Sequence, residues 1–307
     1  MRAESHIANM KNLQIPASLL QLFLLLLTAA VPARAQQAKL STRWEELTAA
    51  DFVQGIKRSQ GTCLLPFGIL EKHGAHLPLG TDLVNVRYLS LTAADQEYVV
   101  VFPEYYFGQI FEAKHQPGTV AYSLPLQLQL LQETTDEMAR NGCKKVLIIN
   151  GHGGNEHLLP LFAQAQMDRP HDYVVYVYWP FSKEAGRPQK KDTVDMHGGE
   201  SETSHAMISR PDLVHMDRVQ NDSGKDLARQ NLPPDVYTGI WWYARFPNHY
   251  SGDASTANKA LGEFDEKSLV ENVVAAIKAI KADQVSLRLQ NEFYEESTHP
   301  LDTKPNQ

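Results

Sequence analysis

Three clusters of histidine and carboxylate residues stand out in the sequence, and glycine residues adjoin each of them. The first reads EKHGAHLPLGTD over residues 71–82, the second NGHGGN over residues 150–155, and the third HGGESETSH over residues 197–205. Imidazole and carboxylate groups together form a ligand set suited to Zn²⁺, Mn²⁺ or Fe²⁺. One such cluster alone is weak support for a metal site, because many are surface residues. Three of them, each at the end of a predicted strand or helix, favour one.

The first cluster directly follows an apolar run over residues 62–70, which we expect to be a buried strand. Glu71 and His73 are two residues apart, so an extended chain directs both side chains the same way. Asp82 can return to them after a loop that contains glycine and proline. In α/β folds, ligand sites form where the chain leaves the carboxyl ends of strands. The position of this cluster therefore favours a binding site.

The second and third clusters have simpler alternatives. The second is a glycine-rich turn between a predicted strand and a predicted helix, where His152 could be incidental. Such a turn can bind phosphate, but this one lacks the P-loop lysine and the dinucleotide-binding glycine pattern. In the third cluster, Glu202 could be a first-turn helix residue that the helix dipole favours.

Strands and helices alternate along the chain around these clusters. The pattern of apolar residues predicts strands over residues 62–70, 98–103, 144–150 and 172–179, and helices over residues 124–140, 156–167, 202–209 and 269–281. Nearly continuous apolar strands indicate a mostly parallel sheet with both faces covered, and therefore an α/β fold. The polar segments, which we expect to be loops or a loose tail, are residues 183–192, 221–235 and 291–307.

The composition is that of a globular protein. Of 307 residues, 43% are hydrophobic and 21% are charged, which excludes a collagen-like, low-complexity or wholly disordered chain. The formal net charge is −7, so no broad basic surface for nucleic acid is expected.

The N-terminal segment has the features of a secretory signal peptide. Lys11 precedes an apolar run over residues 15–31, and Ala33 and Ala35 provide small residues before a cleavage site. A membrane anchor is the alternative, but the run is short and polar residues interrupt it. We expect cleavage after Ala35, with residues 36–290 as one exported domain, periplasmic or secreted and free of the membrane.

Two cysteines, Cys63 and Cys143, remain in this domain. Export permits a disulfide between them. Each lies in or just before an apolar strand-like run, however, and this position favours buried free thiols. We therefore expect free thiols, and neither cysteine lies in a catalytic motif.

Taken in order, the three clusters resemble the motifs of the creatininase family of metal-dependent amidohydrolases. The family motifs are E-Q-H-G-x-H-L-P-L-x-T-D, N-G-H-G-G-N and H-x-G-E-x-E-T-S, and residues 251–263 resemble a further C-terminal family segment. The resemblance extends from about Trp44 to Ile280. It implies a three-layer α/β/α sandwich and a homo-oligomer, often a hexamer.

The resemblance also implies two divalent metal ions per chain, with Zn, Mn or Fe as candidates. By matching positions, Glu71, Asp82 and His152 would bind one ion. His73 and a shared Asp82 would bind the other.

One ligand of the second ion departs from creatininase, which has a glutamate two residues after the N-G-H histidine. This chain has Gly154 at that position. We expect Glu200 to replace the missing ligand, with Glu202 as the less favoured candidate.

The activity implied is hydrolysis of a non-peptide or cyclic amide C–N bond by a water that two metal ions activate. His197 is our candidate for proton transfer to the leaving nitrogen. The alternative is that His197 only orients Glu200. A metallopeptidase acting on short peptides and a non-catalytic metal-binding or solute-binding protein are the other hypotheses.

Two residues are candidates for the pocket of a small amide substrate. Trp179 matches an active-site tryptophan of creatininase, and Glu112 lies where the family often has Glu-His. The lid tryptophan of creatininase corresponds to Thr193, which weakens the case for creatinine as the substrate. We expect His76 and Asn155 to shape their loops.

Overall fold

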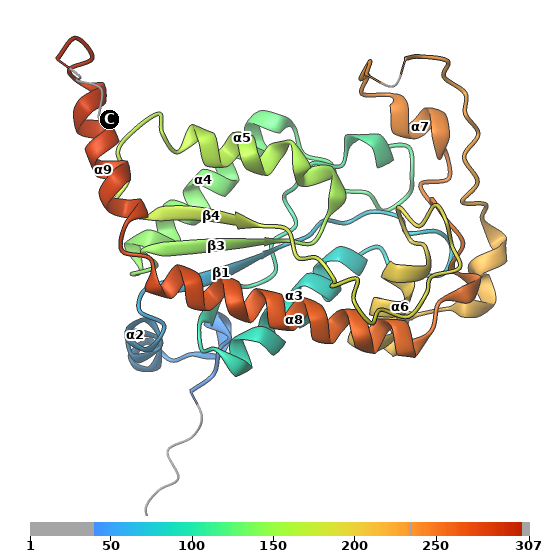
Figure 1. Ribbon diagram of the computed structural model, residues 1–307, viewed down its shortest axis with the longest axis horizontal. Helices are drawn as coiled ribbons and strands as arrows, with labels where there is room; N and C mark the ends of the chain where they lie inside the picture. The colour runs from blue at the N-terminus through green and yellow to red at the C-terminus, as the bar shows by residue number, and fades with distance from the viewer. Residues whose placement is uncertain (1–39, 234, 303–307) are drawn as a thin grey trace, which may run out of the picture. The chain divides into compact units, whose positions relative to one another are not determined.

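A parallel sheet lies at the centre of the computed structural model, which describes residues 40–233 and 235–302 (Figure 1). The strand order is β2 (Val100–Val101), β1 (Thr62–Phe67), β3 (Lys145–Asn150) and β4 (Val174–Tyr178). All three strand pairs are parallel, which confirms the predicted α/β class. The expected signal peptide over residues 1–35 lies outside the described residues.

Helices cover both faces of this sheet, as a three-layer sandwich requires (Figure 1). Alternate strand residues point to opposite faces. Leu65 packs in one core with residues of α4 (Leu124–Arg140) and α5 (Leu158–Ala165), and Phe52 and Ile56 of α2 (Ala49–Arg58) pack against that core. Leu64 packs in a second core with residues of α3 (Thr81–Gln96) and α8 (Lys259–Ala282).

The remaining elements complete the described part of the chain. They are α6 (Glu200–Ser209), α7 (Trp241–Arg245), α9 (Ser286–Ser297) and the 3₁₀ helices Trp44–Glu46, Phe111–Ala113, Gly153–Glu156, Pro211–Leu213, Met216–Asn221 and Ala254–Thr256. No described helix is both long and apolar enough to cross a lipid bilayer.

Several helices differ from the sequence predictions: α2, α3 and α7 were not predicted, and others have different bounds. The predicted helix over residues 269–281 begins earlier, at Lys259. The loose tail expected from residue 291 is instead helical as far as Ser297. Its buried Tyr294 donates a hydrogen bond to the Gln166 carbonyl, and this contact with the end of α5 holds the polar helix in place.

The register of the sheet places the ends of two strands side by side. Phe67, the last residue of β1, pairs with Asn150, the last residue of β3. The first cluster begins four residues after Phe67 and the second begins with Asn150 itself, so both leave the sheet at the same edge. The helices α3 and α6 also begin there, and this edge is where the candidate site forms.

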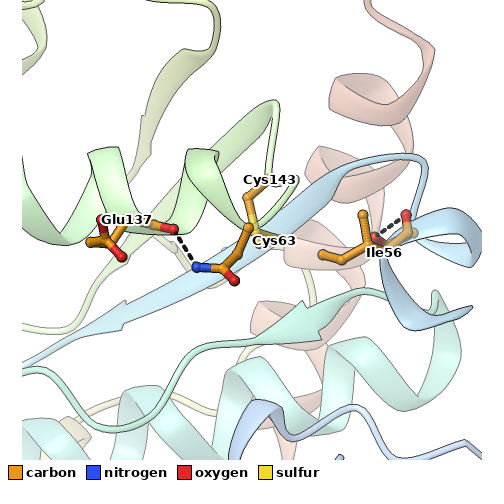
Figure 2. The surroundings of a disulfide bond; sticks show 6 residues. Ile56, Cys63, Glu137 and Cys143 are labelled. Carbon is orange, nitrogen blue, oxygen red and sulfur yellow. Dashed lines mark hydrogen bonds between the residues drawn. A yellow bond between two sulfur atoms is a disulfide. The ribbon is translucent and has the colours of Figure 1, made fainter. Parts of the chain in front are cut away.

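The two cysteines form a disulfide bond, so the expectation of free thiols is wrong (Figure 2). Both residues are fully buried, and Ile56 packs against the hydrophobic core that contains them. The physical reason is the strand register: Cys63 pairs with Val146 across β1 and β3, and Cys143 lies in the turn that enters β3. The Cα atoms of the two cysteines are consequently only 5.7 Å apart.

Candidate metal centre

Four of the five expected metal ligands come together in a buried cluster. The Nδ1 atom of His152 lies 2.9 Å from Glu71 Oε1 and 3.0 Å from Asp82 Oδ2. The Nε2 atom of His73 lies 3.1 Å from the other oxygen of Asp82, Oδ1. All four residues are less than a tenth exposed. Asp82 therefore presents its two oxygens to two different histidines, the geometry that a shared ligand requires.

The backbone fixes which nitrogen of each cluster histidine carries the proton. The opposite nitrogen of each ring lies against a main-chain carbonyl: His152 Nε2 is 3.0 Å from the Gln109 oxygen, and His73 Nδ1 is 3.3 Å from that of Glu71. A carbonyl oxygen only accepts hydrogen bonds, so these nitrogens donate. The nitrogens that face the carboxylates then carry lone pairs when the rings are neutral. Metal-binding histidines have this arrangement.

Two carboxylate oxygens in the cluster have no hydrogen-bond partner. Glu71 Oε1 and Asp82 Oδ2 are buried, and both face the Nδ1 atom of His152. A lone pair directed at two carboxylate oxygens is repulsive unless a positive charge lies between them. The donor set therefore fits a divalent cation, as the first cluster predicts.

The pKa values of the cluster show the same demand for positive charge. Burial lowers the pKa of His73, but the charge of Asp82 and its hydrogen bond outweigh burial and raise the pKa to about 10. Burial raises the pKa of Glu71, but the nearby His152 and His197 bring it well below its ordinary value. Protons on His73 and His152 supply the positive charge when no cation does.

Glu202, not Glu200, faces the cluster, so the preference for Glu200 is corrected. The Glu202 Oε2 atom lies 3.9 Å from His73 Nε2 and accepts a 2.5 Å hydrogen bond from the Gly198 backbone. The Glu200 Oε2 atom instead accepts hydrogen bonds from the backbone of Lys191 and Asp192, at 2.7 and 2.8 Å. Side chains two residues apart in a helix point in nearly opposite directions, so only one of Glu200 and Glu202 can face the cluster.

His197 lies beside these groups. Its Nδ1 atom is 3.9 Å from Glu202 Oε2, and its Nε2 atom is 2.8 Å from the Lys72 carbonyl oxygen, to which it donates. Burial lowers the pKa of His197 to about 3, so the ring is neutral with its lone pair on Nδ1. The alternative that His197 orients Glu200 is not supported, because it faces Glu202.

The two predicted substrate-pocket residues line different cavities that both reach the cluster. A cavity of about 260 Å³ is lined by Glu112, His197 and Glu202 among others. A second cavity, of about 280 Å³, is lined by Trp179 and, again, Glu202. His152 lines both cavities. The cluster is thus approached from two sides.

His76 and Asn155 shape the loops, as expected, and do not join the cluster. His76 Nε2 lies 2.9 Å from the Thr203 hydroxyl. Asn155 donates to the Asn150 side chain at 3.1 Å and accepts from the Gln109 backbone at 3.0 Å.

The sequence motifs missed three residues of the site. His249, only 2% exposed, contacts the Glu71 carboxylate. Trp241 and Trp242 of α7 line the 260 Å³ cavity. The only signal for His249 is its position two residues before the segment over residues 251–263 that resembles the family.

Comparisons with known proteins identify the family of this chain. The family model of creatinine amidohydrolase matches residues 45–277. A creatinine amidohydrolase from Pseudomonas putida is 26% identical over 252 residues, 76% of this chain and 95% of that protein. A mycofactocin precursor peptide peptidase from Mycolicibacterium smegmatis is 29% identical over 232 residues, 73% of this chain and 87% of that protein. A solved mutant creatininase of Zn-Zn type superposes with a TM-score of 0.65 at 23% identity, over 79% of this chain and 99% of that one. The chain belongs to the creatininase family.

Proposed function

We propose that this chain hydrolyses the C–N bond of an amide with two divalent cations, Zn, Mn or Fe. The observation that carries the proposal is Asp82, whose two oxygens face His152 and His73 separately. Glu71, Asp82 and His152 would hold one ion. His73, Asp82 and Glu202 would hold the other. The Zn-Zn form of the similar creatininase supports a two-ion site.

Cations bound there would lower the pKa of a water molecule and polarise the carbonyl group of the substrate. The chain itself contributes proton transfer and orientation. His197 lines the cavity with its Nδ1 lone pair free of any main-chain partner, while the Lys72 carbonyl holds Nε2–H in place. We assign to Nδ1 of His197 the acceptance of a proton from the attacking water and its delivery to the leaving nitrogen.

We propose a small amide, cyclic or otherwise not a peptide, as the substrate. The cavity of about 260 Å³ is just below the usual range for small-molecule sites, as suits a small substrate, and the indoles of Trp241 and Trp242 line it. These rings can contact a planar amide. Thr193, at the position of the creatininase lid tryptophan, has no ring and cannot do so.

A short peptide is the second candidate, because a further cavity adjoins the first. This third cavity, of about 430 Å³, shares Glu112 with the 260 Å³ cavity, and Tyr237, Ile240 and Tyr243 line it. It has room for an apolar side chain beyond the cluster. The peptidase relative from Mycolicibacterium smegmatis supports this reading.

Product analysis on metal-loaded protein tests both candidates. The panel should contain lactams, formamides, creatinine and dipeptides to tetrapeptides, with Asp82→Asn protein as the inactive control. Release of an amine from a lactam or formamide supports the first candidate, and release of amino acids from peptides supports the second. Metal-loaded protein that binds a panel compound and never cleaves one would overturn both in favour of a non-catalytic binding protein.

We also propose that the protein works outside the cytoplasm. The Cys63–Cys143 disulfide supports this, because disulfides persist in oxidising compartments. N-terminal sequencing of protein recovered from the periplasm or medium should begin at Gln36. Full-length chain found only in the cytoplasm would contradict export.

A further inference from the structure

His249 occupies an unusual place beside the candidate metal centre. It follows α7 in the chain, is almost completely buried, and its Nε2 atom contacts Glu71 Oε2. Its backbone φ is +51°, in the left-handed region that non-glycine residues rarely adopt. Such a conformation persists where the surroundings impose it, often at functional sites.

Trp242 determines how this histidine is protonated. The indole Nε1–H of Trp242 donates a 2.9 Å hydrogen bond to His249 Nδ1. An indole nitrogen can only donate, so Nδ1 must be the acceptor and carry no proton. The proton of His249 is therefore on Nε2, and Nε2–H donates to Glu71 Oε2.

This arrangement is opposite to that of the other three histidines of the site. His73, His152 and His197 each donate to a main-chain carbonyl through one ring nitrogen, and when neutral they present the lone pair of the other toward carboxylate oxygens. His249 presents a proton instead. The two oxygens of Glu71 thus differ: Oε2 accepts from His249, whereas Oε1 faces Nδ1 of His152 2.9 Å away.

We propose that His249 is a positioning residue for Glu71, with its tautomer set by Trp242. By donating to Oε2, His249 fixes the rotation of the carboxylate and leaves Oε1 for a metal ion. Because Trp242 also lines the 260 Å³ cavity, the Trp242–His249–Glu71 chain joins the wall of the substrate pocket to the metal centre. The metal-related part of this inference rests on the proposed function, whereas the tautomer does not.

The alternative is that His249 binds a metal ion directly. Ligand atoms of Glu71, His197 and His249 lie within 4.8 Å of one another, which would permit it. In that case Nε2 would have to lose its proton when metal binds.

Nitrogen NMR of ¹⁵N-histidine-labelled protein separates the two roles. We expect the Nε2–H tautomer for His249 both without metal and after titration with Zn²⁺. Trp242→Phe should abolish the fixed tautomer, whereas Trp241→Phe, the neighbouring tryptophan of the same cavity wall, should keep it. An Nδ1–H tautomer in the metal-free chain, or an Nε2 signal that reports bound zinc, would overturn the proposal.

Metal affinity supplies a second measurement that does not depend on catalysis. His249→Gly suits the positive φ and removes the donor, while His249→Gln restores an amide donor. Zn²⁺ affinity, measured by competition with a chelator, should fall about 10–100-fold in His249→Gly and recover in part in His249→Gln. Equal affinity in wild type and His249→Gly, or no recovery in folded His249→Gln, would contradict the positioning role. If wild type itself bound no metal, the proposed function would fail, and NMR would still decide the tautomer.

Discussion

The Oε2 atom of Glu202 lies 3.9 Å from Nε2 of His73, on the opposite side of α6 from the contacts of Glu200. Glu202→Gln removes a carboxylate charge from the cluster, so we expect it to lose chiefly the second metal ion. Glu200→Gln should retain both ions, because it perturbs only hydrogen bonds to the backbone of residues 191–192. Elemental analysis after dialysis measures the number of metal ions per chain. Loss of an ion from the Glu200 variant alone would reverse this assignment.

Asp82→Asn should lose both metal ions. Whichever Asp82 oxygen is replaced by the amide nitrogen, the ion on that side loses a ligand, beside His73 or beside His152. The loss of negative charge also weakens binding of the other ion. Asp136→Asn is a matched control, because Asp136 accepts hydrogen bonds on α4, on a different element from the cluster. Metal content per chain is again the measurement, and two retained ions in Asp82→Asn would refute a shared ligand.

Gly154 is required by the packing around His152. A Cβ atom at this position would clash with His152 Nε2 and come within 2.9 Å of Glu112 Oε1. Gly154→Ala should therefore displace the imidazole from the Gln109 carbonyl and lower Zn²⁺ affinity, by roughly the 10–100-fold seen when such supporting contacts are lost. Gly153→Ala is the control, since a Cβ there has no neighbour within 4 Å. Equal loss of Zn²⁺ affinity in both variants would contradict this account. So would unchanged affinity in both.

The sequence predicted the centre of the site because its motifs are local to strand ends. Glu71, His73 and His152 lie within six residues of the ends of β1 and β3, and parallel strands bring their carboxyl ends to one edge. The preference for Glu200 over Glu202 rested on the family motif, which does not give the orientation of α6 about its axis. Side chains two residues apart in a helix differ in direction by about 200°, so the packing of α6 decides which carboxylate faces the cluster.

Other features needed tertiary information that no local pattern contains. His249 reaches Glu71 from a loop 178 residues further along the chain. The disulfide depended on the register between β1 and β3. The helix α3 was missed because ten of its residues, on several sides, are buried, and such a helix lacks the single apolar stripe that predicts amphipathic helices.

Removal of the disulfide should lower stability substantially. Cys63 and Cys143 are 80 residues apart, and a loop of that length constrains the unfolded chain by about 4 kcal/mol in the chain-entropy model. The double variant Cys63→Ala/Cys143→Ala should show this loss in urea unfolding. Reductant should reduce the free energy of unfolding of wild type to a similar value and leave the double variant unchanged. Equal stability of oxidised wild type and the variant would show that the bond adds nothing.

Asp136 should stabilise the fold only above acidic pH. Its burial raises the pKa, but hydrogen bonds from Tyr173 (2.7 Å) and Arg169 (2.8 Å) outweigh burial and lower it. A carboxyl whose pKa is lower in the folded than in the unfolded chain, where it is about 3.9, adds stability that disappears as pH falls through the folded value. Asp136→Asn should therefore cost at most about 1 kcal/mol at pH 7, since a third of the side chain is exposed. Urea unfolding should show that the difference in free energy of unfolding between wild type and Asp136→Asn is smaller at pH 3 than at pH 7. A larger difference at pH 3 would mean that the fold raises the pKa of Asp136.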